Sequence, residues 1–408
     1  MAGIAQVYRC LKERRVDPLS ALLDLSAAEK FEGGLEYTPH EIAHQPGTWI
    51  TTFRSLKTRL EQLRSFLSNA GVDGASAQKP TVFLVGAGTS DYIGQSLHLL
   101  LRTKWQCEVI PVASTTLLMD FPEYVLRDKR YLWISFSRSG DSPEGVAVLD
   151  RALAEHPVIA HVLITCNAAG RMAKVVAGRA NCLSIVLDDA TNDRGLAMTA
   201  SFTNMVLAGQ IMAHAWSIDE YEPVLTALVA AGEKLLPRAA ALAFALTQSG
   251  FQRACFVGSG ALAGAALESA LKLLELTAGK VQTMTQPTLA LRHGPMAALD
   301  KETLFVSLVS SDARRRHYEV DLLREIGSKQ LVRTRVAIAT EATLLNADAE
   351  YVLTPATDDP VPDLYRPVLD VIFGQLLGLS ASIQLGLKPD VPSPNGAISR
   401  VVQNVDIY

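Results

Sequence analysis

The stretch VFLVGAGTSDYIGQSLHLLL, residues 82–101, decides the fold class of this chain. An apolar run that is typical of a buried strand enters a G-x-G turn, and apolar residues then recur at helical spacing. The same plan returns in ACFVGSGALAGAALESALKLLEL, residues 254–276, with Gly258 in the place of Gly86. A repeat on this scale indicates a duplicated domain, since the repeats of solenoid proteins are much shorter.

Strands and helices alternate after both copies of this plan. Further strands are expected at residues 131–137, 161–167, 182–187, 303–311, 335–340 and 350–354, and apolar spacing predicts a helix over 50–67. Alternation predicts a parallel sheet between layers of helices. We therefore expect an α/β protein of two tandem domains, each a mainly parallel sheet flanked by helices in a flavodoxin-like three-layer sandwich. The expected parts are a helical extension over 1–49, a first domain over 50–220, a second over 221–390 and a tail over 391–408.

Composition excludes several classes of protein. The 408 residues carry a net charge of −4 and are 49% hydrophobic, which argues against a general nucleic-acid binder. The chain contains no apolar run of about 18 residues that would predict a transmembrane helix, and its start lacks the apolar core of a signal peptide. The five cysteines have no C-x-x-C spacing, which is typical of free thiols. We expect a cytoplasmic protein.

A hydroxyl-rich segment, ISFSRSGDSPEG at residues 134–145, ends one of the expected strands. Hydroxyls of Ser137, Ser139 and Ser142 and the backbone N–H groups between them can wrap a phosphate without a metal. The alternative is a serine-rich N-cap for a helix that begins at Pro143. Capping accounts for Ser142 but not for Ser137 and Ser139.

The two G-x-G turns also allow two interpretations. Thr89 and Ser90 follow the first turn at an expected helix start, where N–H groups attract anions. The alternative, above all for the second copy, is a plain strand-to-helix turn. Position 91 is Asp and no GK[ST] follows, so neither a dinucleotide fingerprint nor a Walker loop is present. Because ligands of parallel sheets bind at the carboxyl ends of strands, the first turn and the serine-rich loop can converge on one phosphorylated ligand.

Motifs spread over nearly the whole chain add a family resemblance. They are HEIAHQPGTW, GAGTS, ISFSRSGDSPE, ITCN, DRGLAMT, ESALKLLELTAGK, RHGP and SRVVQ. Together they resemble the galactosamine-6-phosphate deaminase/isomerase branch of the sugar-isomerase (SIS) domain family, whose members are also called tagatose-6-phosphate ketose/aldose isomerases. The layout is similar to the isomerase half of glucosamine-6-phosphate synthase, which implies two SIS domains in tandem.

The resemblance implies roles for individual residues. Glu275 matches the proton-shuttling glutamate, Lys272 matches its neighbouring lysine, and His293 matches the ring-opening histidine. In the related synthase this histidine comes from a neighbouring subunit, which implies a homodimer with shared sites. The positions assigned to phosphate binding are Ser90, Ser137, Arg138, Ser139 and Ser142, and those assigned to the sugar are Gly88, Thr89, Ala197 and Met198.

Two further positions, Arg400 and Arg194, are assigned to the sugar. Arg400 departs from the pattern of the synthase, and Arg194 has an alternative role. Arg400 stands where the synthase has a tail lysine that can form a Schiff base with the ketose. Because arginine stays protonated, it cannot form that imine, and we expect Arg400 to act by charge or hydrogen bonding. Arg194, next to Asp193, can orient a sugar amine or hydroxyl, or it can form a loop ion pair with that aspartate.

Spacing by itself says less about the chemistry. Lys272 and Glu275 share a helix face, which by spacing alone indicates a surface ion pair. An unperturbed histidine titrates at about pH 6.5, which suits ring opening by His293. His40 and His44 have i,i+4 spacing, but prolines flank them and no third ligand is evident. We expect neither a metal nor a cofactor.

Together with these observations, the resemblance implies an enzyme that acts on phosphosugars. The expected reaction converts D-galactosamine 6-phosphate to D-tagatose 6-phosphate and ammonia, as Glu275 moves a proton from C2 to C1 and water hydrolyses the imine. The alternatives are a tagatose-6-phosphate ketose/aldose isomerase and a deaminase of glucosamine 6-phosphate. A non-catalytic phosphosugar-binding regulator is the rival from another class. The expected partner is a hexosamine or hexose 6-phosphate, and neither nucleic acid nor membrane.

Overall fold

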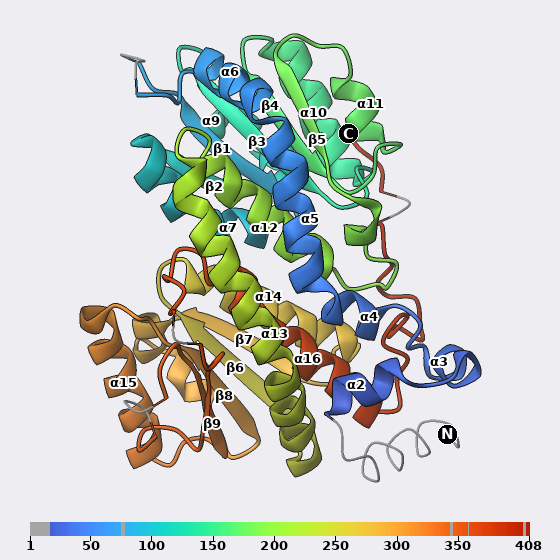
Figure 1. Ribbon diagram of the computed structural model, residues 1–408, viewed down its shortest axis with the longest axis vertical. Helices are drawn as coiled ribbons and strands as arrows, with labels where there is room; N and C mark the ends of the chain where they lie inside the picture. The colour runs from blue at the N-terminus through green and yellow to red at the C-terminus, as the bar shows by residue number, and fades with distance from the viewer. Residues whose placement is uncertain (1–16, 75–77, 343–345, 358, 403–404) are drawn as a thin grey trace. The chain divides into compact units, whose positions relative to one another are not determined.

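The structure is a computed structural model that describes residues 17–74, 78–342, 346–357, 359–402 and 405–408 (Figure 1). Residues 1–16, which include Cys10 and the start of the expected helical extension, lie outside this part. The chain divides into two compact units. The described residues of 47–192, 200–225 and 398–408 form what we call the N-sheet unit, and those of 17–46, 193–199 and 226–397 form the C-sheet unit.

A five-stranded parallel sheet in the order β2-β1-β3-β4-β5 forms the centre of the N-sheet unit. β1 and β3 are buried along their whole lengths, as their apolar runs predict. The strand order reverses between these two strands, and ligands of this topology bind at that switch point. The strands are β1 (Thr81–Gly86), β2 (Val109–Ala113), β3 (Tyr131–Ser137), β4 (Ala160–Thr165) and β5 (Cys182–Val186).

Helices cover both faces of this sheet (Figure 1). On one face α7 (Thr89–Trp105) packs on β1 and β2, and α12 (Ala200–Ala213), buried at every residue, packs on α7. On the other face Phe83 and Trp133 form an apolar core with the helices that follow β2 and β3, and the helix that follows β4 joins a second core around Leu163. These helices are α8 (Ser114–Met119), α9 (Phe121–Tyr124), α10 (Pro143–Glu155) and α11 (Arg171–Val176), and a 3₁₀ turn, η1 (Asp189–Thr191), follows β5.

The C-sheet unit repeats this plan with the sheet order β7-β6-β8-β9-β10, again all parallel. Its strands are β6 (Arg253–Gly258), β7 (Gln282–Pro287), β8 (Thr303–Leu308), β9 (Thr334–Ile338) and β10 (Tyr351–Leu353). α14 (Leu262–Leu276) packs on β6 and β7, and α16 (Pro367–Gln384) packs on α14. α15 (Ala313–Ser328), η2 (Thr288–Arg292) and η3 (Pro295–Ala298) complete a separate apolar core around Phe305. The predicted α/β class, with two domains that each contain a parallel sheet flanked by helices, is confirmed.

Other helices lie outside the two repeats. α2 (Pro18–Leu23), α3 (Ala27–Gly33) and α4 (Thr38–Ala43) precede the first sheet, and α13 (Ile218–Ser249) precedes the second. The helix expected over 50–67 is divided into α5 (Gln45–Thr58) and α6 (Leu60–Ala70). Arg59 leaves the helical conformation at the break, and its guanidinium donates to the Ser184 carbonyl at 2.9 Å.

Within the described residues, α16 is long and apolar enough to span a membrane by length and composition. Its 18-residue window has a mean hydropathy of 1.3, but 89% of that window is buried inside the protein. Two glycines explain how it packs, because a Cβ on Gly374 would lie 2.4 Å from the Ser269 Cβ, and one on Gly378 would lie 2.9 Å from the Lys272 carbonyl oxygen. α16 is therefore a core helix that approaches α14 closely.

Two strands, β2 and β7, were not predicted from the sequence, and both lie at the edge of a sheet. β2 contains Pro111, which an edge strand tolerates because its outer side makes no ladder. β7 reads QTMTQP and is partly exposed, so it lacks the apolar run of a central strand.

Candidate active site

The two G-x-G turns make the same close approach and place their second glycine at a similar positive φ. A Cβ on Gly86 would lie 2.3 Å from the carbonyl oxygen of Ser90, and one on Gly258 would lie 2.5 Å from that of Leu262. The second glycines, Gly88 and Gly260, have φ of +55° and +60°. Glycine is therefore required for the tight turn in both copies, and the duplication extends to the φ of the second glycine.

The serine-rich loop folds on its own hydroxyls. Ser137 ends β3, and its Oγ accepts the Gly140 N–H at 3.0 Å, while Ser139 Oγ accepts the Asp141 N–H at 3.1 Å. Ser142 is the N-cap of α10, as predicted, and accepts the Gly145 N–H at 3.4 Å. Ser137 and Ser139 are acceptors in these contacts, so each hydroxyl keeps its own proton for a further bond.

The loop between β4 and α11 holds the serine-rich loop in place. Asn167 Nδ2 donates to the Ser139 carbonyl at 2.8 Å, and the Met172 N–H donates to the Gly140 carbonyl at 2.9 Å. A Cβ on Gly170 would lie 2.6 Å from the Ser139 carbonyl oxygen, so the two loops touch through their backbones. The serine-rich loop is thus fixed before any ligand arrives, which lowers the entropy cost of binding.

Two arginines link the serine-rich loop to the tail. Arg138 is buried and donates from Nη2 to the carbonyl of Arg400. Arg400 Nη2 in turn donates to Asn192 Oδ1 at 2.7 Å. Thr89 and Ser90 are buried in the first turn of α7, which follows the neighbouring strand β1. The N-sheet unit therefore brings the predicted phosphate residues and Arg400 to the switch point of its sheet.

The predicted Lys272 and Glu275 are not a surface pair. Lys272 is fully buried on α14, and its Nζ lies 2.6 Å from Glu275 Oε2 and 3.2 Å from Glu268 Oε1. The side chain of Glu268 is also fully buried, whereas that of Glu275 is 24% exposed. Burial by itself lowers the pKa of Lys272, but the two carboxylates outweigh it and raise the pKa above its usual value. The cluster is a buried ammonium between two carboxylates, and one of these carboxylates reaches the surface.

Glu268 was missed by the sequence interpretation. Its signal is the i,i+4 spacing to Lys272 in ESALKLLE, which places both on one helix face. An apolar helix such as α14 rarely buries charge without partners, so the acid and base imply each other.

His293 makes no hydrogen bond or ion pair with this cluster in the part of the chain that the structure describes. It caps the 3₁₀ helix η2 and is exposed, and Gly294 after it has a φ of +117°. Among the described residues its ring makes no hydrogen bond or ion pair. An exposed histidine is free to meet another molecule, which the predicted role across a subunit boundary requires.

The segment 193–198 contains the predicted sugar residues Arg194, Ala197 and Met198, and it belongs to the C-sheet unit. Asp193 accepts the N–H of Thr199 at 2.8 Å and its hydroxyl at 2.9 Å. Arg194 is exposed with its guanidinium 6.0 Å from the centre of the Tyr37 ring. Ala197 is buried and Met198 half-buried, so this segment offers mainly backbone to a ligand.

One carboxylate that the sequence interpretation missed, that of Glu41, holds this segment together with the backbone of Asp390. Glu41 Oε1 accepts the N–H groups of Arg194 and Gly195, and the Asp390 carbonyl accepts the Leu196 N–H at 3.0 Å. Burial and the nearby Asp193 raise the pKa of Glu41 to about 8, although the two N–H groups oppose the shift. Glu41 lies in the motif HEIAH, where the histidines and not the acid were considered as ligands.

Metal ligands do not gather in the part of the chain that the structure describes. No group of three or more His, Cys, Asp or Glu residues there could hold a metal ion. The rings of His40 and His44 meet edge to face with centroids 4.6 Å apart. Burial, with His40 adding to it, lowers the pKa of His44, so this pair is a packed contact.

Comparison with known proteins identifies the family. No protein-family model matches the chain. An AgaS protein of Streptomyces coelicolor is 37% identical over 377 residues, which cover 91% of this chain and 95% of that protein. D-galactosamine-6-phosphate deaminase AgaS of Escherichia coli is 34% identical over 381 residues, with the same coverage. The chain belongs to the D-galactosamine-6-phosphate deaminase AgaS family. The resemblance read from the motifs is thereby confirmed.

Solved structures agree with membership of the AgaS family. The crystal structure of tagatose-6-phosphate ketose/aldose isomerase from Escherichia coli superimposes with a TM-score of 0.81 at 30% identity. The match covers 91% of this chain and 96% of that one. Two SIS-type sheets in tandem are therefore the fold of this family member, as the sequence predicted.

Proposed function

We propose that this chain deaminates D-galactosamine 6-phosphate to D-tagatose 6-phosphate and ammonia. The observation that carries the proposal is the Glu268–Lys272–Glu275 cluster in a member of the AgaS family. A fully buried ammonium costs free energy unless partners offset the loss of its hydration. Here it donates to Glu275, the carboxylate that retains solvent access and can therefore meet a substrate.

In this proposal the phosphate binds at the switch point of the N-sheet. Ser90, Ser137, Ser139 and Ser142 supply hydroxyls, and Arg138 supplies charge. The N-terminus of α7 adds backbone N–H groups that favour an anion. The carboxyl-end position on the sheet and the preformed loop support these assignments, together with the family resemblance. Gly88 and Thr89 would lie against the sugar, as would Ala197, Met198 and Arg194.

The proton transfer is assigned to Glu275. After His293 assists ring opening, Glu275 removes the proton from C2 of the open-chain aldehyde and leaves an enolamine. The same carboxyl returns the proton to C1, which gives an imine at C2. Water adds to this imine, ammonia leaves, and the ketone of tagatose 6-phosphate remains. Lys272 acts as a positioning residue, because its bond to Glu275 Oε2 orients the carboxylate and stabilises its charge.

Arg400 is proposed to bind the substrate without covalent chemistry. Its guanidinium stays protonated and cannot condense with a ketone. The backbone carbonyl of Arg400 accepts from the Arg138 guanidinium and so joins the tail to the serine-rich loop, which supports a role in holding the sugar phosphate. We therefore expect no borohydride-trapped adduct between the tail and tagatose 6-phosphate.

We also propose a cytoplasmic homodimer in which His293 serves the site of the partner subunit. The exposure of His293 and the family resemblance support this arrangement. Mixing His293→Ala with Glu275→Gln subunits tests it, because shared sites restore part of the activity in the mixed dimer. Sites built from a single subunit would gain nothing from mixing.

A second candidate is simple aldose–ketose isomerisation, since one similar solved structure is called a tagatose-6-phosphate ketose/aldose isomerase. The two reactions share the C2-to-C1 proton transfer and differ in whether an amine leaves. Initial rates of ammonia release from galactosamine 6-phosphate and glucosamine 6-phosphate, beside ketose formation from galactose 6-phosphate, separate them. We expect ammonia from galactosamine 6-phosphate. Turnover of galactose 6-phosphate without ammonia from either amino sugar would favour the isomerase, and binding without turnover would favour a regulator.

A further inference from the structure

The loop after β8 stands in the C-sheet unit where the serine-rich loop stands in the N-sheet unit. With the two sheet orders aligned, β6 corresponds to β1 and β8 corresponds to β3. The second glycines of the turns after β6 and β1 have similar φ angles of +60° and +55°. The switch point of the second sheet therefore lies between β6 and β8, where this topology would place a ligand.

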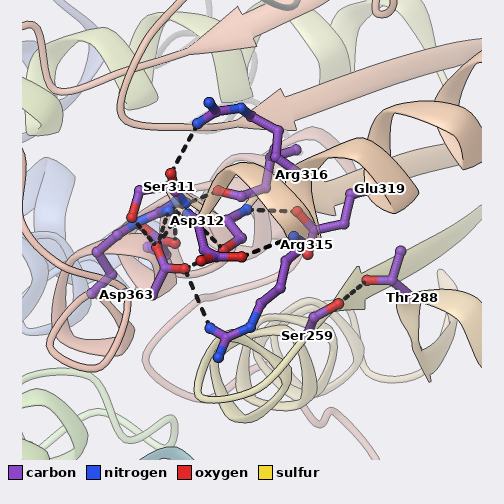
Figure 2. A network of polar contacts seen from close by, with 12 residues as sticks. Ser259, Thr288, Ser311, Asp312, Arg315, Arg316, Glu319 and Asp363 are labelled. Atoms are coloured by element: carbon purple, nitrogen blue, oxygen red, sulfur yellow. Dashed lines mark hydrogen bonds and ion pairs between the residues drawn. The ribbon is translucent and has the colours of Figure 1, made fainter.

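Two carboxylates of the chain occupy this second switch point (Figure 2). Asp363 Oδ1 accepts the N–H and the hydroxyl of Ser311, each at 2.9 Å, and Oδ2 accepts the hydroxyl of Ser310. Glu319 Oε2 accepts the Ser310 N–H at 2.7 Å, and the hydroxyl of Ser259, in the glycine turn, donates to Thr288 at 2.9 Å. The amides and hydroxyls of the loop are thus directed at carboxylates from within the same unit.

Positive charge completes the surroundings of Asp363. Arg366 is fully buried and donates from Nη1 to Asp363 Oδ1 at 3.1 Å, and Arg315 Nη1 lies 3.8 Å from Oδ2. Burial by itself raises the pKa of Asp363, but the serine donors and Arg366 outweigh it and hold the pKa below its usual value. Asp363 is therefore an ionised carboxylate held by hydroxyls, an N–H group and a guanidinium. These are the donors that hold a phosphate in other proteins.

The serine-rich loop of the N-sheet unit differs in this respect. Its Ser137 and Ser139 hydroxyls accept N–H groups of their own loop, and no carboxylate contacts either of them among the described residues. A carboxylate, that of Glu144, meets only the capping Ser142, at 3.0 Å. One copy of the fold is thus open to an anion, and the other already holds one.

We propose that the loop after β8 is an oxoanion cradle that the chain fills with its own Asp363 carboxylate, so that each chain takes up one phosphosugar and not two. The ligand class of the emptied cradle is a small tetrahedral oxoanion such as inorganic phosphate. The Asp363 carboxylate takes the place of that ligand and fixes the loop after β8, the start of α15 and the start of α16 to one another.

Removal of the carboxylate tests the proposal directly. Asp363→Ala, titrated with inorganic phosphate by calorimetry, should bind one more phosphate per chain than the wild type. A crystal grown in phosphate should show the ion against Ser310, Ser311 and Arg366. Asp321→Ala is the matched control, because it removes one negative charge from an exposed position of α15 and should bind as the wild type does. A folded Asp363→Ala protein that binds no additional phosphate would overturn the proposal.

Two more variants separate occupancy from charge and from folding. Asp363→Asn keeps the shape of the side chain and should leave the cradle filled, so additional phosphate in this variant would contradict the filling. Arg366 also donates to the carboxylate of Asp370, at 2.7 Å, and none of these substitutions removes that partner. If Asp363→Ala loses its native circular dichroism, Asp363→Ser offers Arg366 a small acceptor and answers the question in the same titration. Wild-type protein gives a third readout, since sorbitol 6-phosphate should bind at one site per chain and two sites would refute the proposal.

Discussion

Replacement of Lys272 by methionine tests whether the charge cluster on α14 is as buried as the structure has it. The substitution keeps the length of the side chain and removes an ammonium that lies 2.6 Å from Glu275 and 3.2 Å from Glu268. Glu268 then remains a fully buried carboxylate without its cation. Breaking a buried pair in this way costs about 3–5 kcal/mol, whereas an exposed pair contributes about 0–1 kcal/mol.

Lys329 provides a matched control. It also pairs with a carboxylate on its own helix, at 2.6 Å from Glu325, but its side chain is 52% exposed. We expect Lys329→Met to change the free energy of unfolding by less than about 1 kcal/mol. The double variant Glu268→Gln/Lys272→Met should recover part of the loss, because the amide removes the uncompensated charge.

Urea unfolding read by two probes measures the effect. All four tryptophans, Trp49, Trp105, Trp133 and Trp216, belong to the N-sheet unit, so their fluorescence follows that unit, while far-ultraviolet circular dichroism follows both. The loss in Lys272→Met should therefore be larger in the dichroism signal wherever the two transitions separate. Equal effects of Lys272→Met and Lys329→Met on unfolding would refute the burial argument.

Three further perturbations follow from the structure. Gly374→Ala places a Cβ within 2.5 Å of the α14 backbone and should destabilise the protein by about 1–3 kcal/mol. Gly47→Ala, whose new Cβ would have no atom within 4 Å, should stabilise the protein by about 0.4–1 kcal/mol, and the urea midpoints of the two variants compare these effects. Burial raises the pKa of Glu41 from 4.5 to about 8 in the folded protein, so its contribution to stability is complete below pH 4.5 and is lost as the pH rises through 8. Glu41→Gln should therefore flatten the dependence of the melting temperature on pH across that range. Ser139→Ala should raise the KM for the sugar phosphate by roughly 10–100-fold with little change in kcat, since it removes one hydrogen bond to a charged group, while Ser328→Ala on α15 should leave steady-state rates unchanged.

The central strands could be predicted, and the serine-rich loop could be singled out, because their signals are local. β1 and β3 were expected at the residues where the structure has them, since strands buried on both faces are continuously apolar. The serine-rich loop was visible because helix capping accounts for only one of its hydroxyls, that of Ser142. The edge strands β2 and β7 were not visible, because a half-exposed strand needs no apolar run.

The contacts of the candidate site residues could not be predicted from local sequence. Spacing places Lys272 and Glu275 on one face, but burial of that face depends on α16, whose glycines lie about a hundred residues further along the chain. Glu41 and Asp363 act on backbone N–H groups that are remote in sequence, at Arg194 and Ser311. Such contacts have no local pattern, because any surface acid looks the same in the sequence.

Ammonia release by Glu275→Gln protein, beside that of the wild type, tests the central claim most directly. Wild-type protein should release ammonia from D-galactosamine 6-phosphate and form tagatose 6-phosphate. Glu275→Gln should bind the substrate with nearly unchanged Kd, while kcat falls by roughly 100- to 10,000-fold, because the amide cannot carry the proton from C2 to C1. Undiminished ammonia release by the variant, or none from the wild type, would contradict the account.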